Sequence, residues 1–209
     1  MPVALFSTLA LLVVLRVLAS LDQWVYNAVQ PLGSAAGDWV ASAVTLLGRT
    51  DIAAGIAVVT TLVLVVRWRR LLPGIAPLAI LAVLPLVDAL KNGIGQHRPP
   101  AGTGHDLLLL PTLLPKAAQT LSFPSNHAAL AAFLAVVIGH AAPRWRPVVW
   151  ALAIAVAFSR LYLDKHWASD VIGGVLLGVI VGEAAWLVAS FLSGRVRRAA
   201  AGQGVRREP

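Results

Sequence analysis

Long apolar segments recur along the whole chain, and they restrict its fold more than any other feature of the sequence. Residues 171–192 are the clearest case, because this stretch as an α-helix would span about 33 Å and a bilayer core measures roughly 30 Å. Hydrophobic residues make up 58% of the 209 residues and charged residues only 12%, which argues against a soluble globule. The sequence therefore predicts an all-α polytopic membrane protein with six transmembrane helices. The other five segments are 3–19, 51–66, 74–90, 128–142 and 147–163.

The beginning of the chain contains two kinds of segment. No basic region precedes residues 3–19 and more apolar segments follow, so we interpret this stretch as a retained helix and not as a cleaved signal peptide. Residues 21–50 mix Trp24, Tyr26 and Trp39 with polar residues, a composition typical of the membrane interface. We expect short interfacial helices here, on the outer face.

The distribution of basic residues predicts the orientation in the plasma membrane. With six crossings, the arginine clusters after the second, fourth and sixth segments fall on one side, which is the cytoplasmic side by the positive-inside rule. Both termini are then cytoplasmic, with a six-span domain at 1–193 and a disordered basic tail at 194–209. The net charge of +8 resides in these clusters, so we expect no nucleic-acid partner. The clusters consist of Arg67, Arg69, Arg70, Arg144, Arg146, Arg195, Arg197, Arg198, Arg206 and Arg207.

Two features of the last apolar segment concern packing. Gly174, Gly178 and Gly182 recur every four residues and predict a small-residue stripe for close helix contact. Glu183 lies inside the same segment, where a carboxylate needs a partner or a wet cavity, and the sequence offers no obvious partner for it.

The stretch SRLYLDKHWASD at 159–170 lies on the opposite, outward side. If it is helical, His166 and Asp170 share one face, because residues four apart are neighbours on a helix. A histidine oriented by a carboxylate is suited to act as a nucleophile or base, although a structural ion pair gives the same pattern. We expect Asp164 and Lys165 to face solvent.

Two further polar groups occur on the outward side, one at the end of the third apolar segment and one before the fourth. Ser125 is a plausible N-cap, so the amides of Asn126 and His127 would point outward and form an anion site. Lys91 and Arg98, with Arg160, would add positive charge, although each alone is explained by snorkelling at a helix end. Their coincidence on one face favours a phosphate-handling site.

These motifs together are similar to a known family signature. Lys91 with Arg98-Pro99, then Pro124-Ser125-Asn126-His127, then Ser159-Arg160 with His166 and Asp170, resemble the three motifs of the type 2 phosphatidic acid phosphatase superfamily. That superfamily includes membrane lipid phosphatases, glucose-6-phosphatase and vanadium haloperoxidases. One departure is Asn126, where the family usually has glycine, and this affects the expected substrate preference more than the reaction.

The resemblance, together with the chemistry of the side chains, implies a role for each residue. His166 would attack phosphorus and form a phosphohistidine, while Asp170 holds its other ring nitrogen. His127 would protonate the leaving oxygen and then activate water. The remaining residues would stabilise the phosphate oxygens: Lys91, Arg98, Arg160, Ser125 and the amide of Asn126.

The expected substrate is a phosphorylated lipid whose headgroup reaches the pocket. Polyprenyl diphosphates, phosphatidylglycerol phosphate and phosphatidic acid all fit, and phosphotransfer to an acceptor other than water stays open. An anionic-lipid transporter or flippase would explain the basic residues but not His127, His166 and Asp170. No metal or cofactor is expected, because the surrounding cations would repel a divalent ion from a histidine-aspartate centre. The sequence makes no prediction of oligomeric state.

Overall fold

The computed structural model describes residues 1–67, 71–100 and 120–204, the last nine of these by backbone alone. The described part is helical, as predicted, and contains no named strand. A π-helical turn, Val63–Arg67, extends α4, and short 3-10 turns join several of the helices. The α-helices are α1 (Pro2–Val14), α2 (Ala19–Val29), α3 (Ala35–Thr45), α4 (Thr50–Leu62), α5 (Leu71–Ile75), α6 (Ile80–Ile94), α7 (Asn126–Ala141), α8 (Arg146–Tyr162) and α9 (Ala168–Gly204).

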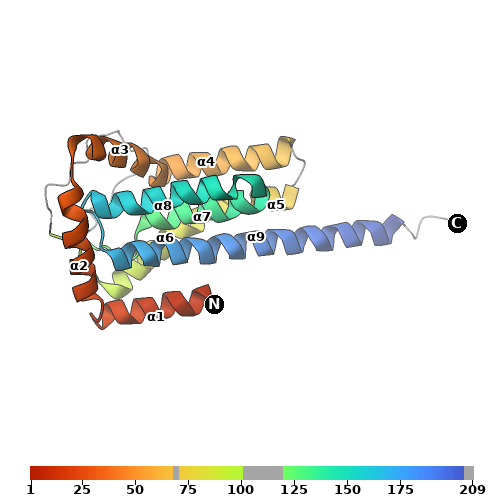
Figure 1. The fold of residues 1–209 in the computed structure, drawn as a ribbon. Coiled ribbons are helices and arrows are strands. Elements are labelled where there is room, and N and C mark those ends of the chain that lie inside the picture. The colour runs from red at the N-terminus through yellow and green to blue at the C-terminus, as the bar shows by residue number, and fades with distance from the viewer. Residues whose placement is uncertain (68–70, 101–119, 205–209) are drawn as a thin grey trace.

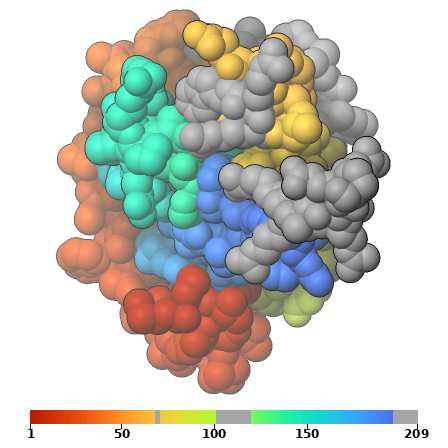
Figure 2. All heavy atoms as spheres, turned by 90° about the vertical axis from the view of Figure 1, so that its right-hand side faces the viewer, coloured from red at the N-terminus to blue at the C-terminus, as the bar shows by residue number. Residues whose placement is uncertain are grey.

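The long helices run lengthwise beside one another, and α2 crosses one end of the bundle (Figure 1). The start of α1 and the end of α9 lie at the opposite end from α2. Figure 2 views the molecule from that second end, where α9 lies between the start of α1 and the turn that joins α7 to α8. The chain therefore has two distinct ends, one with both termini and one with α2.

Several helices are long and apolar enough to cross a bilayer. Thr50–Arg67, Leu71–Ile94 and Ala168–Arg195 each qualify, and the bent pair of α1 and α2 can count as a fourth span. The protein is thus an integral membrane protein. α7 is apolar but shorter, and the exact count of six crossings stays a prediction.

The first predicted span is shorter than expected. α1 ends at Val14, and the chain turns at Arg16, which adopts a φ of 55°. α1 and Ala19–Leu32 then meet at 92°, so α2 leaves the direction of the bundle. The exposed Trp24 on α2 and Trp39 on α3 suit the interfacial helices that we predicted for 21–50.

The end of α9 also differs from the expected domain boundary at 193. The helix continues to Gly204, so most of the segment 194–209 extends α9. Residues 205–209 lie outside the described part, as do Arg69 and Arg70, and the division into a domain and a disordered tail stays a prediction.

α7 forms the centre of the bundle. Nearly all of its residues from Ala128 to Ala141 are buried, and it packs mainly against α9 and α8. A Cβ atom on Gly174 or Gly178 of α9 would collide with the backbone carbonyl oxygens of Ser125 and Ala129 on α7. The predicted glycine stripe is therefore a close helix contact.

Candidate active site

Four helix ends meet near α2: the end of α6, the start of α7, the end of α8 and the start of α9. Gly95, with a φ of 71°, ends α6 in the left-handed conformation that glycine adopts readily. The chain after it pairs with the segment before α7, since the Ser122 amide donates to the carbonyl of Gln96 at 2.7 Å. This pairing connects the segment carrying Arg98 to the segment carrying Ser125.

His166 and Asp170 are in contact, as the sequence predicted. Nδ1 of His166 lies 3.2 Å from Oδ2 of Asp170, and both side chains are buried. The local geometry differs from the expected shared helix face, because α9 begins at Ala168 and His166 precedes it. Asp170 instead lies in the first turn, where its Oδ2 also accepts from the Trp167 amide at 2.8 Å. With Nδ1 facing the carboxylate, Nε2 of His166 is left for other chemistry.

Two side chains that the sequence analysis missed hold this pair in place. The Ser122 hydroxyl lies 3.1 Å from Oδ1 of Asp170 and equally 3.1 Å from the carbonyl oxygens of Gln96 and His97, so three acceptors share its single proton. Asp22 of α2, itself buried, accepts from the amide of Ser169 at 2.8 Å and from its hydroxyl at 2.6 Å. The sequence carries a signal for Asp22, which is an acid beside an apolar segment, within the stretch 21–50 that we predict to be interfacial.

The start of α7 supplies the second group. Ser125 occupies the N-cap position, but its hydroxyl does not cap the helix and has no hydrogen-bond partner in the described part, although it is buried. The Asn126 amide group donates to the Thr50 hydroxyl at 3.2 Å, and its Oδ1 is likewise buried without a partner there. A buried polar atom without a partner costs free energy, which a bound ligand would recover.

His127 is packed closely against another helix. A Cβ atom on Gly48, which precedes α4, would lie 2.9 Å from Cβ of His127 and 3.0 Å from its Cδ2. The backbone at Gly48 therefore packs against one side of the His127 side chain.

Three cations complete the cluster. Arg160, buried at the end of α8, donates from Nη1 to the Thr45 hydroxyl at 2.7 Å. Arg98 donates from Nη1 to the carbonyl of Lys165 at 2.9 Å. Lys91 is buried in the last turn of α6.

The electrostatics show that these predicted residues converge on His166. Burial, followed by the charges of Arg160, Arg98, Lys91 and His127, lowers the pKa of His166 well below 6.5. Burial also lowers the pKa of Arg98. His166 is therefore a neutral imidazole at neutral pH, which is the form of histidine that can act as a nucleophile.

The expectation for Asp164 was wrong. Its side chain is only 6% exposed, with a φ of 61°, and it hydrogen-bonds Tyr26 of α2 instead of facing solvent. Lys165 is half-buried, and its carbonyl accepts from Arg98. The chain reverses direction between α8 and α9, and this tight turn packs against α2 on the side where the sequence suggested solvent.

No group of three or more His, Asp or Glu side chains suited to a metal ion occurs among the described residues. The cluster has the composition of an oxyanion site: three cations, two histidines, one oriented carboxylate and an unused buried hydroxyl.

A sequence model of the PAP2 superfamily matches residues 72–193, more than half of the chain and the whole of this cluster apart from Asp22 and Thr45. The chain belongs to the PAP2 superfamily. The resemblance inferred from the three motifs is thereby confirmed.

Relatives of this PAP2 chain include an undecaprenyl-diphosphatase from Sulfolobus acidocaldarius. It is 30% identical over 136 residues, which cover 65% of this chain and 60% of the relative. A decaprenylphosphoryl-5-phosphoribose phosphatase from Mycobacterium tuberculosis is 43% identical over 77 residues, or 37% of this chain and 41% of the relative. The chain thus matches less than two thirds of the length of these relatives.

Two solved structures share the fold, and one of them is described as a PAP2-type phosphatase. The phosphatidylglycerolphosphate phosphatase from Bacillus subtilis superimposes with a TM-score of 0.72 at 21% identity, over 93% of this chain and 96% of that one. LpxE from Aquifex aeolicus gives a TM-score of 0.61 at 23% identity, over 79% and 94%. The helical arrangement around the cluster is therefore that of the PAP2 membrane proteins.

Proposed function

We propose that this protein is a metal-independent phosphatase that hydrolyses a phosphate mono- or diphosphate ester of a membrane lipid. The observation that carries the proposal is the buried His166, whose Nδ1 lies 3.2 Å from Asp170 and whose neutral form is favoured by burial and by surrounding cations. A transporter that only binds anions would need the cations but not this oriented imidazole.

The reaction has two steps. Nε2 of His166 attacks phosphorus, the bond from phosphorus to the leaving oxygen breaks, and His127 gives that oxygen a proton. Asp170 accepts the Nδ1–H hydrogen bond and stabilises the imidazolium character that develops. His127 then takes a proton from water, whose oxygen attacks phosphorus, and the phosphorus–nitrogen bond breaks to release phosphate and neutral His166.

Binding of the phosphate oxygens falls to the cations and to the start of α7. Lys91, Arg98 and Arg160 neutralise the charge on the equatorial oxygens. The buried hydroxyl of Ser125, which makes no hydrogen bond in the described part, donates to one oxygen, and the amide of Asn126 at the helix N-terminus donates to another.

The substrate is a lipid phosphate, and polyprenyl carriers are the first class to test. Relatives that are 30% and 43% identical have names that specify undecaprenyl diphosphate and decaprenylphosphoryl phosphoribose as substrates. Phosphatidylglycerol phosphate and phosphatidic acid are the comparison substrates. We assign the site to the extracytoplasmic face, with both termini in the cytoplasm, because the arginine clusters follow the positive-inside rule.

The decisive experiment measures inorganic phosphate release by the purified protein from a panel of these lipids, with and without EDTA. We expect release that persists in EDTA and is lost in H166A, and a phosphohistidine that is trapped in wild type but absent from H166A. H97A is the matched control, because the exposed His97 contributes only its carbonyl to the described contacts. Substantial phosphate release by H166A, or strict dependence on added metal, would exclude the proposed mechanism.

A further inference from the structure

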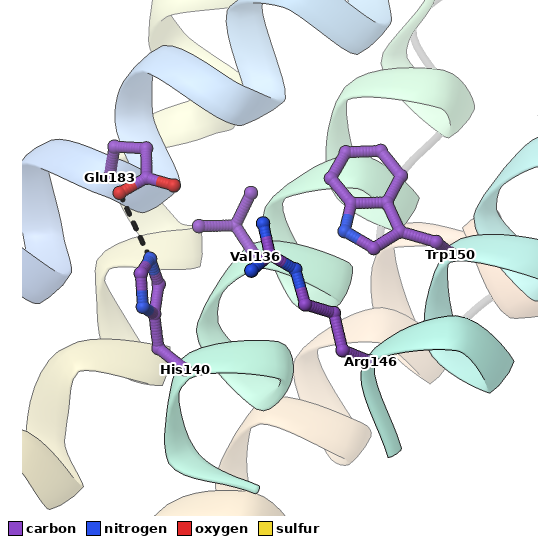
Figure 3. Close-up of a pocket in the computed structure, with 5 residues that line it drawn as sticks. All are labelled: Val136, His140, Arg146, Trp150 and Glu183. Atoms are coloured by element: carbon purple, nitrogen blue, oxygen red, sulfur yellow. Dashed lines mark hydrogen bonds and ion pairs between the residues drawn. The ribbon is translucent and has the colours of Figure 1, made fainter. Parts of the chain in front are cut away.

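A second group of polar side chains lies far from the cluster at the start of α7. Five residues from three helices line a small cavity: Val136 and His140 of α7, Arg146 and Trp150 of α8, and Glu183 of α9 (Figure 3). We call it the α7–α9 pocket. His140 is about 21 Å along α7 from Asn126, so the pocket belongs to the end of the bundle that carries the termini.

The carboxylate in this pocket has the kind of partner that we expected Glu183 to need, one that the sequence did not identify. Its Oε2 lies 2.9 Å from Nε2 of His140, whose ring stacks on Trp186 at 5.3 Å. The two side chains are 34% and 40% exposed, so the pair faces outward from the bundle and not into its core. Placing ionisable side chains such as these within a membrane-spanning segment costs free energy, so such a pair indicates a functional site.

The two hydrogen-bond donors that line the pocket, Arg146 and Trp150, have no such partner among the described residues. Figure 3 shows the guanidinium of Arg146 pointing toward the Glu183–His140 pair, on the side of Trp150. Within the described part of the chain, Arg146 makes no hydrogen bond or ion pair, and the indole N–H of Trp150 makes none either. Guanidinium and indole groups can only donate, so Arg146 and Trp150 can bind an acceptor in addition to the Glu183 carboxylate that lines the same pocket.

The size of the cavity limits what can enter it. Its volume is about 20 Å³, room for one water-sized group, and it is only partly enclosed. One oxygen of a tetrahedral anion fits, with the rest of the anion outside. An arginine beside a tryptophan at the end of a membrane helix is also where a lipid phosphate lies.

We propose that the α7–α9 pocket binds a phosphate-type oxyanion through Arg146 and Trp150, separately from the catalytic cluster. The ligand chemistry is that of a phosphodiester or phosphate oxygen, supplied by an anionic phospholipid of the adjacent leaflet or by free phosphate. Glu183 and His140 close the opposite wall, and their mutual contact leaves Arg146 available to the anion.

Thermal unfolding of the purified, delipidated protein tests this. In mixed micelles, phosphatidylglycerol raises the Tm of wild type above its value in phosphatidylcholine, because a ligand that binds only the folded state stabilises it. R146Q loses most of that increase and W150F part of it. R144Q is the matched control, since Arg144 is an exposed arginine two positions earlier that does not line the pocket, and it keeps the full increase.

The outcomes distinguish a lipid from free phosphate as the source of the anion, and they distinguish failure of this site from failure of the proposed phosphatase activity. A rise that depends on Arg146 with inorganic phosphate alone assigns the site to the free anion, and a rise seen only with phosphatidylglycerol assigns it to the lipid. No Arg146-dependent increase with either phosphatidylglycerol or inorganic phosphate, or equal losses in R144Q and R146Q, would overturn the proposal. Phosphate release by R146Q from a short-chain substrate stays at the wild-type level, so failure of this site leaves the phosphatase assignment intact.

Discussion

At the scale of single residues, the environment of His166 decides its chemistry. The imidazole is buried among cations, and both conditions disfavour its protonated form, so its pKa falls well below 6.5. Its orientation depends on Asp170, which is held in turn by the Trp167 amide and the Ser122 hydroxyl. Two consequences can be measured.

The pH dependence of kcat/KM reports on the charge around His166. Because its pKa is lowered, His166 stays neutral between that low pKa and pH 6.5, where a free histidine would already be protonated. R98Q removes one positive charge, so the pKa of His166 rises and the acid limb of the profile moves to higher pH. R98K retains the charge and the position of the limb. An acid limb at the same pH in R98Q and R98K would contradict this account.

The hydroxyl of Ser122 is expected to act through Asp170. S122A removes a hydrogen bond that the carboxylate shares with the carbonyls of Gln96 and His97. Because a full hydrogen bond is typically worth about 0.5–1.5 kcal/mol, we expect kcat to fall by up to roughly 10-fold with KM unchanged. The matched control is S159A, because the equally buried Ser159 hydroxyl bonds only the Val156 carbonyl of its own helix, at 2.7 Å. Steady-state kinetics on one lipid substrate make the comparison, and equal effects of the two variants would remove the role of Ser122.

At the scale of elements, the contact between α7 and α9 sets the geometry of the site. α7 begins with Ser125 as its N-cap and α9 carries Asp170 in its first turn, and the Ser125 amide donates to the Asp170 carbonyl at 2.9 Å. The two helices approach closely because glycines of α9 face backbone carbonyls of α7. A change in their separation therefore moves the two halves of the site relative to one another.

G178A tests this coupling. The added methyl group would meet the Ala129 carbonyl oxygen, so the helices must separate, at a cost of about 1–3 kcal/mol. We expect a lower Tm and a lower kcat. G194A on the same helix is the control, because a Cβ there meets nothing within 4 Å and alanine favours the helix. A Tm of G178A at or above that of G194A would show that the contact is not tight.

At the scale of the whole molecule, the candidate active site lies at one end of the bundle, and the start of α1 and the end of α9 lie at the other (Figure 1). α2 crosses the catalytic end, where Asp22 holds the start of α9, and the α7–α9 pocket belongs to the other end. In a membrane these two ends face different compartments, so the orientation of the bundle decides which compartment supplies the substrate.

The absence of cysteine from the sequence allows a clean test of orientation. N92C lies at the catalytic end and R144C at the other, and both positions are exposed. With the proposed topology, a membrane-impermeant maleimide labels N92C in intact cells and labels R144C only after lysis. The wild-type protein, which has no cysteine, is the unlabelled control for both variants. The reverse pattern would place the catalytic cluster in the cytoplasm.

The sequence by itself determined the features that depend on composition and on local spacing. Apolar segments of membrane length predicted an all-helical membrane protein, because an unpaired backbone cannot cross hydrocarbon. The glycine period in 171–192 predicted a close helix contact, and the motifs around Lys91, Ser125 and His166 predicted the family and the residues that the structure brings together at the candidate site. Each of these inferences uses residues near one another in the chain, where periodicity and residue chemistry carry the information.

Only the tertiary structure decided which residues that are distant in the sequence meet in the folded bundle. Asp22 reaches Ser169, Thr45 reaches Arg160, and His140 pairs with Glu183, and each contact joins helices whose relative positions the sequence does not encode locally. The dependence on helix packing also explains why the prediction for Asp164 was wrong. Asp164 looked solvent-facing in a charged turn but packs beneath α2. Whether a polar side chain meets water or a partner depends on which helix packs over it, and that depends on the energetics of the whole bundle.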